Sequence, residues 1–421
     1  MKSINQVMEK LSLASLVALA LFLFCSFSLS ASHHILLALP GVYFFYRAVA
    51  EKKLKRFDRS SKCLLVLTVL LAGSILANWN EIARPWHFLF KIKYFVFGFL
   101  AIYAYQSSFE KKLSVKNLRF IIHLFLFSAA IASISGLIGY ATGFNPLRMQ
   151  TTTHASRASG MYGMTITYSF AAALLSAILM SALFRYKKVK KYCSINLLVF
   201  TLGITLLGLF FSFGRGAIFG LLLALPFIFV PKKLKLLVLC TVLLILSAFG
   251  YIYLNRIKAF GLGSFRDTKK VTLGRTVGKQ SGAVRYAHLL ATYYMVKEHP
   301  FFGVGFRNYE SRIVPYKQKY KLGDPKWRAW KGHAHNNFLE VLGGAGLFAF
   351  IAFVGFHVFW LMDLYRRNDL FGDILIPFVI VYIGAGMFQS AIIDGETQFF
   401  LMAVFALSKL QWPPANKKNI V

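Results

Sequence analysis

The chain has 421 residues and a formal net charge of +34, and 57% of its residues are hydrophobic and 16% aromatic. The hydrophobic residues fall in repeated long runs, which excludes a soluble globular protein and predicts an all-α polytopic membrane protein. The sequence contains no glycine-rich nucleotide loop, so it does not indicate ATP-driven chemistry. Its four cysteines lie inside apolar runs or at their cytoplasmic ends and indicate no disulfide framework: Cys25, Cys63, Cys193 and Cys240.

About twelve apolar runs are predicted to cross the roughly 30 Å hydrocarbon layer as helices. They are residues 11–30, 34–49, 63–79, 88–105, 120–141, 162–184, 195–213, 216–230, 234–254, 337–362, 374–393 and 398–410. Three of these runs, 34–49, 216–230 and 398–410, are short and would need a thinner bilayer or help from neighbouring helices. The first run lacks a small-residue cleavage site, so we interpret it as a retained signal anchor.

Lys and Arg are concentrated in every second connection, which predicts that both termini are cytoplasmic. These basic connections lie at 52–56, 111–112, 185–191, 232–235, 366–367 and 417–418. The short connections predicted on the other side, at 31–33, 80–87 and 394–397, contain only Arg84 among them.

A large basic loop is predicted between spans nine and ten, which divides the chain into helices 1–9 (1–254), the loop (255–335) and helices 10–12 with a cytoplasmic tail (336–421). Residues 256–332 contain seventeen Lys or Arg against four acidic residues, a net charge of +13. Long loops cross the membrane whatever their charge, so this one can be external. Such a surface suits anions, for example lipid phosphates and diphosphates, although a solubilised face beside anionic headgroups is the simpler explanation for many of its cations.

Within this loop, residues 281–298 have the apolar spacing of a helix, which Pro300 ends. The glycines of 301–306 then predict a turn. A helix that is aromatic on one face and basic on another is expected to lie along the membrane interface.

His333 and His335 end the loop, and in an extended segment they would lie on the same side. A metal site would need further ligands, of which Glu340 and the distant Asp394 and Glu396 are weak candidates. Both imidazoles could instead form a helix cap with Asn336 and Asn337. A third hypothesis makes one imidazole a general base, because its ordinary pKa near 6.5 leaves it neutral at ambient pH.

Three arginines are candidate anion ligands on the external side. Arg215 stands between two apolar runs, where a guanidinium is costly unless it has a partner, and its flanking glycines admit a phosphate. Simple snorkelling to the headgroups would also explain it. Arg157, ahead of span six, and Arg285, on the loop helix, converge with Arg215 and the histidines only if the fold brings four separated segments together.

Several short motifs, in this order, resemble those of the O-antigen ligase and polymerase superfamily. They are Arg157 to Gly160, Ser212 to Gly216, Arg285 followed by His299 to Gly305, and His335 to Leu339 with Gly343 and Gly346. The twelve-span layout with one large loop extends the likeness to the whole chain, and is most similar to the enterobacterial O-antigen ligases, the lipid A-core:surface polymer ligases.

The resemblance implies a glycosyltransferase of lipid-linked (GT-C-like) architecture, acting without a metal or other cofactor at the periplasmic face of a Gram-negative inner membrane. It would take O-antigen polysaccharide from undecaprenyl pyrophosphate and attach it to a sugar hydroxyl of lipid A-core, in lipopolysaccharide biosynthesis. Its expected partners are therefore these two lipids and the membrane, with no nucleic acid.

The site residues follow from combining the resemblance with the chemistry of the side chains. His335 is the expected general base, with His333 second. Arg215 and Arg285 are expected to bind the pyrophosphate, and Arg157 a phosphate on either lipid. Asp394 and Asn336 are possible orienting groups, although Asp394 could equally cap an ordinary turn. No carboxylate nucleophile is evident, which favours direct, inverting attack.

Other functions remain open. An O-antigen polymerase would use the same donor with a lipid-linked glycan as acceptor, and a protein O-oligosaccharyltransferase shares the motifs. A lipid or polysaccharide flippase, which is not an enzyme, should have charged residues deep in several spans, and here we expect only His123 and His357. The aromatic and basic segment 313–331 suits either acidic core sugars or anchoring at the interface.

Overall fold

The computed structural model describes residues 2–24, 27–51, 58–109, 114–152, 156–230, 273–323, 325–367 and 369–410, together with 234, 237 and 241. The predicted ninth span, 234–254, and residues 256–272 of the basic loop therefore lie almost wholly outside the described residues, as do Cys25 and Cys240.

The described chain is almost entirely helical, with one two-stranded hairpin. Its helices are α1 (Lys2–Phe22), α2 (Phe27–Ala50), α3 (Arg59–Ala77), η1 (Trp79–Glu81), α4 (Pro85–Lys91), α5 (Lys93–Phe109), α6 (Val115–Thr142), α7 (Thr165–Phe184), α8 (Tyr186–Val189), α9 (Ile195–Phe211), α10 (Arg215–Phe229), α12 (Leu273–Glu298), α13 (Tyr309–Lys319), α14 (Pro325–Arg328), α15 (Asn337–Arg366), α16 (Leu370–Gly386), η4 (Ala391–Ile393) and α17 (Gly395–Ser408). The hairpin strands β1 (Phe144–Asn145) and β2 (Gln150–Thr151) pair antiparallel.

Length and apolarity confirm the prediction of an all-α membrane protein. Six segments of the described chain are long and apolar enough to cross a bilayer, and they are Ser3–Phe22, Arg59–Ala77, Pro85–Phe109, Val115–Thr142, Thr165–Phe184 and Asn337–Arg366. Four shorter apolar helices, α9, α10, α16 and α17, accompany them. Eleven of the twelve predicted runs thus coincide with a described helix, among them the run 34–49 with α2. The total of twelve spans stays a prediction.

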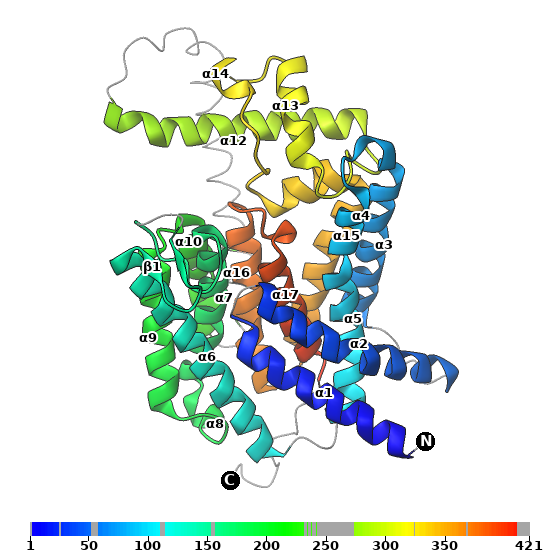
Figure 1. Ribbon diagram of the computed structural model, residues 1–421, viewed down its shortest axis with the longest axis vertical. Coiled ribbons are helices and arrows are strands. Elements are labelled where there is room, and N and C mark those ends of the chain that lie inside the picture. The colour runs from blue at the N-terminus through cyan, green and yellow to red at the C-terminus, as the bar shows by residue number, and fades with distance from the viewer. Residues whose placement is uncertain are drawn as a thin grey trace.

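The helices form an upright bundle that is covered at one end by α12, α13 and α14 (Figure 1). Helix α12 runs across the bundle rather than along it, and its end at Glu298 is the predicted one, although it begins eight residues earlier than Ser281. The start of α1 and the end of α17 lie at the opposite end of the bundle (Figure 1). The side of the membrane on which each of these ends lies stays a prediction.

The predicted boundary between the first two spans is wrong. Helix α1 ends at Phe22 and α2 begins at Phe27, so the predicted 31–33 connection lies inside α2. His33, which such a connection would expose, is buried, and so is its neighbour His34. The Nδ1 atom of His33 lies 2.9 Å from the carbonyl oxygen of Ser15, and both imidazole rings contact Phe399, which gives these polar rings partners inside the bundle.

The predicted run 374–393 is also too long, because α16 ends at Gly386. Residues Met387 to Asp394 instead form a turn that contains η4, which we call the 387–394 turn. The backbone N–H of Ile392 donates to the side-chain oxygen of Asn337 at 2.8 Å. Tertiary hydrogen bonds of this kind compensate for the helical ones that the apolar residues of the turn give up.

Helix α15 packs along α3 over most of its length. Leu64, Leu67, Leu71 and Ile75 follow one another at helical spacing on α3 and are fully buried. The facing side of α15 has small residues, and a Cβ atom at its Gly355 would lie 3.4 Å from the sulfur of Cys63. Small residues allow two membrane helices to approach closely, so this pair forms a rigid wall of the bundle.

A break in α15 receives the turn that follows α12. Gly346 has φ 83° and ψ −179°, which interrupts the helical hydrogen bonds. The N–H of Val304 donates to the carbonyl of Gly343 at 3.0 Å, and the N–H of Leu347 donates to the carbonyl of Pro300 at 2.8 Å. We call this arrangement, in which residues 300–305 lie against residues 343–347, the glycine contact.

Gly346→Ala is expected to disrupt the glycine contact. A Cβ atom there would lie 2.2 Å from the carbonyl oxygen of Phe301, and a side chain at positive φ is strained in any case. We expect the free energy of unfolding to fall by at least about 2 kcal/mol, measured by thermal unfolding in detergent. Gly203→Ala, in α9, is the matched control because its Cβ would meet nothing within 4 Å. Equal midpoints for both variants would contradict the proposed role of Gly346.

Candidate functional site

The candidate site surrounds residues 332–336, which we call the histidine segment. This segment leads directly into α15 at the covered end of the bundle, with α12 and α13 on one side and the 387–394 turn on the other. The glycine contact fixes the start of α15 relative to the end of α12, so it also sets where the histidine segment lies.

A buried carboxylate anchors the histidine segment. Glu340 is 1% exposed, and its Oε2 accepts hydrogen bonds from the backbone N–H of Ala334 at 2.9 Å and from the hydroxyl of Ser390 at 3.1 Å. The same hydroxyl lies 3.2 Å from the N–H of Asn336, which donates to it. Glu340 and Ser390 therefore tie the histidine segment to the 387–394 turn. From the sequence, Glu340 was only a weak candidate metal ligand, and Ser390 was not considered.

Asn336 caps α15. Its side-chain oxygen accepts from the N–H groups of Phe338 at 2.8 Å and Leu339 at 3.1 Å, and its amide donates to the carbonyl of Met387 at 3.1 Å. The capping hypothesis is therefore confirmed for Asn336 and wrong for the imidazoles of His333 and His335. The orienting role suggested for Asn336 stays a prediction.

His335 has a backbone φ of 50°, in the left-handed region that non-glycine residues seldom occupy. Its ring lies parallel to that of His288 on α12, with centroids 6.2 Å apart. Burial and then the nearby charge of Arg285 lower the pKa of His335, which favours the neutral imidazole. The fold thus brings the predicted base and one predicted pyrophosphate ligand together.

His288 is a site residue that the sequence did not single out. It is buried, its Nδ1 lies 2.9 Å from the carbonyl oxygen of His333, and burial followed by the charge of Lys317 lowers its pKa to about 4. It is therefore neutral, with the Nδ1–H donating to that carbonyl. Its position three residues after Arg285, on the same face of one helix, was the available signal.

His333 lies near a carboxylate. Its Nε2 is 3.6 Å from the Oε2 of Glu310 on α13, and the two side chains are 43% and 45% exposed. The Nδ1 of His333 and the Nε2 of His288 make no hydrogen bond within the described part of the chain. Buried polar atoms usually have partners, so these two atoms are available to a bound ligand or water.

Arg215 and Arg157 lie at the same end of the bundle as the histidines. Arg215 is exposed at the start of α10, and a Cβ at its neighbour Gly216 would meet Phe388 of the 387–394 turn. Arg157 is exposed beside the end of α9, where the N–H of Ala158 donates to the carbonyl of Phe211 at 3.0 Å. The four segments thus meet at one end, although no hydrogen bond or ion pair joins either arginine to a histidine among the described residues.

Asp394 and Arg307 lie at the far side of the 387–394 turn. The Oδ2 of Asp394 accepts from the hydroxyl of Thr167 at 3.1 Å and from the amide of Gln389 at 3.3 Å. Burial, and then repulsion from Glu396, raises the pKa of Asp394 to about 6. Arg307 donates from Nη1 to the carbonyl of Ile393 at 2.5 Å. Burial lowers its pKa, while the charges of Asp394 and Glu340 oppose that shift.

Arg307 was missed in the sequence, where it was only one of seventeen loop cations. Its φ of 69° and its place directly after the turn glycines position its guanidinium against the 387–394 turn. Within the described ranges, no group of three or more His, Cys, Asp or Glu side chains is arranged to hold a metal ion.

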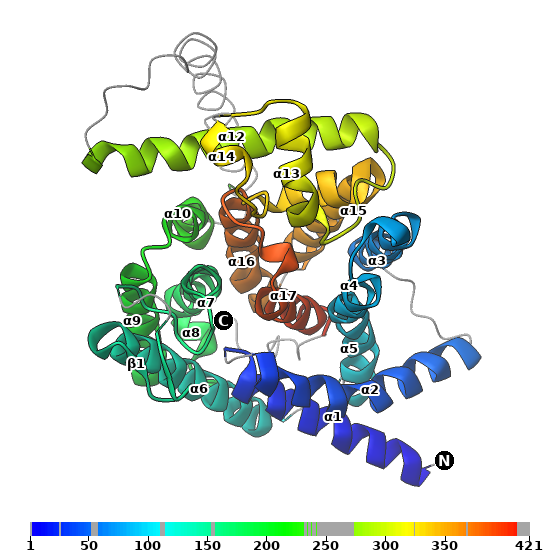
Figure 2. The same cartoon turned by 45° about the horizontal axis from the view of Figure 1, so that its top comes forward.

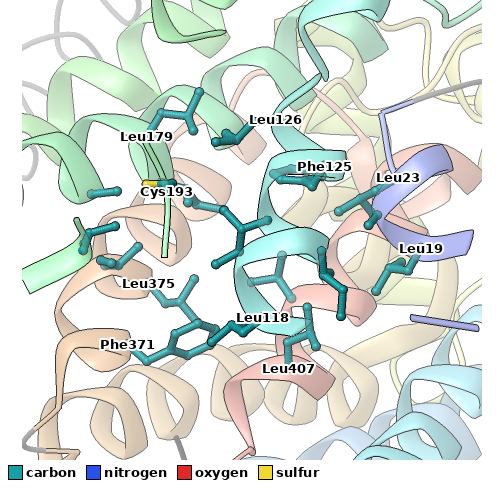
Figure 3. Close-up of a pocket in the computed structure, with 18 of the residues that line it drawn as sticks. Leu19, Leu23, Leu118, Phe125, Leu126, Leu179, Cys193, Phe371, Leu375 and Leu407 are labelled. Atoms are coloured by element: carbon teal, nitrogen blue, oxygen red, sulfur yellow. The ribbon is translucent and has the colours of Figure 1, made fainter. Parts of the chain in front are cut away.

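The structure also contains an apolar cavity of about 220 Å³ among α1, α6, α7, α16 and α17 (Figure 3). Its lining includes Leu19, Leu118, Leu179, Phe371 and Leu407, and Cys193 lies at its edge (Figure 3). Apart from the thiol of Cys193, its lining consists of hydrocarbon side chains that cannot bind an anion, so we place the candidate site at the histidine segment instead.

These features define an α-helical membrane protein with a candidate site of histidines, arginines and buried carboxylates at one end of its bundle. Residues 198–354, in the middle of the chain, match the family described as O-Antigen ligase. The match confirms the resemblance seen in the sequence. The matched region contains Arg215, Arg285 and both histidines, whereas Arg157 and Asp394 lie outside it. A search of curated proteins found no match.

Glu340→Ala is expected to loosen the histidine segment, because it leaves the buried N–H of Ala334 without its acceptor. We expect a loss of about 1–3 kcal/mol in the free energy of unfolding, measured by thermal unfolding. Glu81→Ala is the control: Glu81 forms an exposed ion pair with Arg312 at 3.3 Å, which is worth about 1 kcal/mol at most. A larger loss in the control would contradict the anchoring role of Glu340.

Proposed function

We propose that this protein is an O-antigen ligase that moves O-antigen polysaccharide from undecaprenyl pyrophosphate to a sugar hydroxyl of lipid A-core, without a metal. The observation that carries the proposal is the histidine segment, fixed by Glu340 and Ser390 beside Arg285, in a chain that matches the O-antigen ligase family. The reaction takes place at the periplasmic face of a Gram-negative inner membrane, with both termini in the cytoplasm and the basic loop outside.

His335 is the general base of the proposed reaction. As the acceptor hydroxyl attacks the anomeric carbon of the donor sugar, its proton passes to the neutral imidazole, and the bond to the pyrophosphate oxygen breaks. The lowered pKa keeps His335 neutral, and its left-handed backbone is the kind of local strain found at functional sites. A single displacement of this kind inverts the anomeric centre.

The arginines stabilise the leaving pyrophosphate. Arg285 lies close to His335, and Arg215 and Arg157 lie at the same end of the bundle, so the phosphate charge meets guanidinium groups where it develops. At about 4 Å and an effective dielectric near 20, each contact contributes about 4 kcal/mol before desolvation. Two or three contacts therefore supply the charge stabilisation that a divalent cation would give. Asp394 and Asn336 bind sugar hydroxyls or support the imidazole.

A polymerase is the second candidate, because the family description covers transferases that use the same kind of donor. Its acceptor would be another lipid-linked glycan. The single large basic segment between spans nine and ten supports the ligase, and the acceptor used in a purified system separates the two reactions. A protein O-oligosaccharyltransferase would instead modify a protein hydroxyl. In the same assay it would leave lipid A-core unlabelled.

The proposal is tested by ligation in vitro with undecaprenyl-pyrophosphate-linked O-antigen and lipid A-core in excess chelator. His335→Ala is expected to lower the rate about 10²- to 10⁴-fold, and Arg215→Ala about 10²- to 10³-fold. His123→Ala and Arg119→Ala are the matched controls. Both residues lie in the first turns of α6, at the end of the bundle away from the histidine segment, and both variants should retain activity. A product in which the lipid-linked glycan is extended and lipid A-core is left unmodified would favour the polymerase. Transport of the lipid with no product at all would overturn the assignment as an enzyme.

The pH dependence of ligation should report on His335. Because its pKa lies below 6.5, the rate should begin to fall only when the pH drops below that value. Arg285→Gln removes a positive charge that lowers this pKa, so the acidic limb of kcat/KM should move to higher pH, whatever happens to the maximal rate. Lys297→Gln, at the far end of α12, should leave the limb in place. An unchanged limb in Arg285→Gln would exclude His335 as the titrating base.

A further inference from the structure

A second cationic surface lies on the short helix α4. Arg84, His87 and Lys91 are spaced three and four residues apart, so they share one face of this helix. Arg84 and His87 are exposed and Lys91 is half-buried. Arg84, Lys91 and Arg307 all lie close enough to His87 to act on it electrostatically. We call Arg84, which precedes α4, and Lys91, which ends it, the α4 cation face; the imidazole of His87 lies between them.

The neighbouring face of α4 is aromatic. Trp86 and Phe90 are one helical turn apart and are 72% and 62% exposed. Trp86 packs edge-on against Trp79 at 5.0 Å, and the Nζ of Lys93 lies 4.0 Å from the centre of the Phe90 ring. Exposed aromatic residues beside cations are typical of the boundary between hydrocarbon and headgroups, so α4 lies where a lipid headgroup would meet it.

The α4 cation face adjoins the candidate site from the side opposite Arg215. Lys91 lies within electrostatic range of Arg307 and Glu396, and Arg307 donates to Ile393 in the 387–394 turn. Arg215 adjoins the other end of this turn, through Gly216 against Phe388. Helices α16 and α17 stand between α10 and α4 (Figure 2). The two cationic surfaces thus flank the histidine segment.

Two carboxylates lie near the α4 cation face, and each of them also faces another group. Glu81 forms an ion pair with Arg312 at 3.3 Å, which also links η1 to α13. Glu396 faces both Lys91 and Asp394. Lys91 therefore shares its charge with Glu396, and Arg84 is the exposed cation of this face.

We propose that the α4 cation face binds the phosphate groups of the lipid-anchored acceptor glycolipid. This assignment rests on the proposed function, since it needs an acceptor that is itself a membrane lipid. Donor and acceptor each carry a membrane anchor, so they must approach the histidine segment from different sides. The Arg215 side holds the donor pyrophosphate, and the α4 side holds the phosphorylated acceptor with its acyl chains beside Trp86 and Phe90.

Binding is tested separately from transfer. The full-length protein in phosphatidylcholine nanodiscs is titrated with diphosphoryl lipid A and, separately, with phosphatidylglycerol, and bound lipid is counted by native mass spectrometry. Arg84→Gln combined with Lys91→Gln should weaken lipid A binding about 25-fold, from roughly a fivefold loss for each cation, and should affect phosphatidylglycerol much less. Lys116→Gln combined with Arg119→Gln removes two exposed cations from the other end of the bundle and should leave lipid A binding intact.

Unchanged lipid A binding in the α4 variant would overturn the proposal, and so would an equal loss for both lipids, which would identify a contact with bulk lipid only. Arg84→Gln alone, in the exposed position, keeps the test valid if the double variant is unstable. In the ligation assay the α4 variant should raise KM for lipid A-core without raising KM for the donor. If wild type binds lipid A at α4 but ligates nothing, the proposed function fails while the lipid site stands.

Discussion

The glycine contact is the constraint on which the candidate site depends. A helix inside a membrane cannot leave its backbone groups unpaired, so a break in α15 is tolerated only where other backbone groups replace the lost hydrogen bonds. The turn after α12 supplies these groups: the N–H of Val304 donates to the carbonyl of Gly343, and the carbonyl of Pro300 accepts from the N–H of Leu347. Only glycine fits at 303 and 346, because a Cβ at either position would meet a carbonyl at 2.5 Å or less. The helices α12 and α13 are thereby joined to a membrane helix by main-chain geometry.

The first turns of α15 consequently belong to two units at once. They continue a membrane helix that packs on α3, and they also carry Glu340, which holds the histidine segment and the 387–394 turn. The cost of burying this carboxylate is offset by the N–H and hydroxyl groups that donate to it. Arg307 completes the arrangement by contacting the other end of the same turn. The histidine segment and the 387–394 turn thus connect α12, α13, α15, α16 and α17.

Local pattern was enough to predict most of the framework. Hydrophobic run length located eleven described helices, periodicity located the loop helix that ends at Glu298, and the glycines of 301–306 indicated the turn. Apolarity could not distinguish a helix from the 387–394 turn, because that distinction depends on two polar side chains. Asn337 is remote in sequence from the turn, and Ser390 does not contribute to the hydrophobic pattern. The same limit hid His33 and His34, whose partners lie on α1 and α17. Chemistry-bearing types identified His335, Arg285 and Arg215, whereas His288 and Arg307 became visible only through tertiary contacts.

The bond between Glu340 and Ser390 also has a consequence for the order in which the protein matures. The chain is made from its N-terminus, and Ser390 follows Glu340 by fifty residues, with all of α16 between them. Until that helix has packed into the bundle and the turn beyond it has formed, the histidine segment lacks half of its anchor. The candidate site is therefore among the last parts of the molecule to acquire its final form, and a chain that stops after α15 has its histidines without the support that positions them.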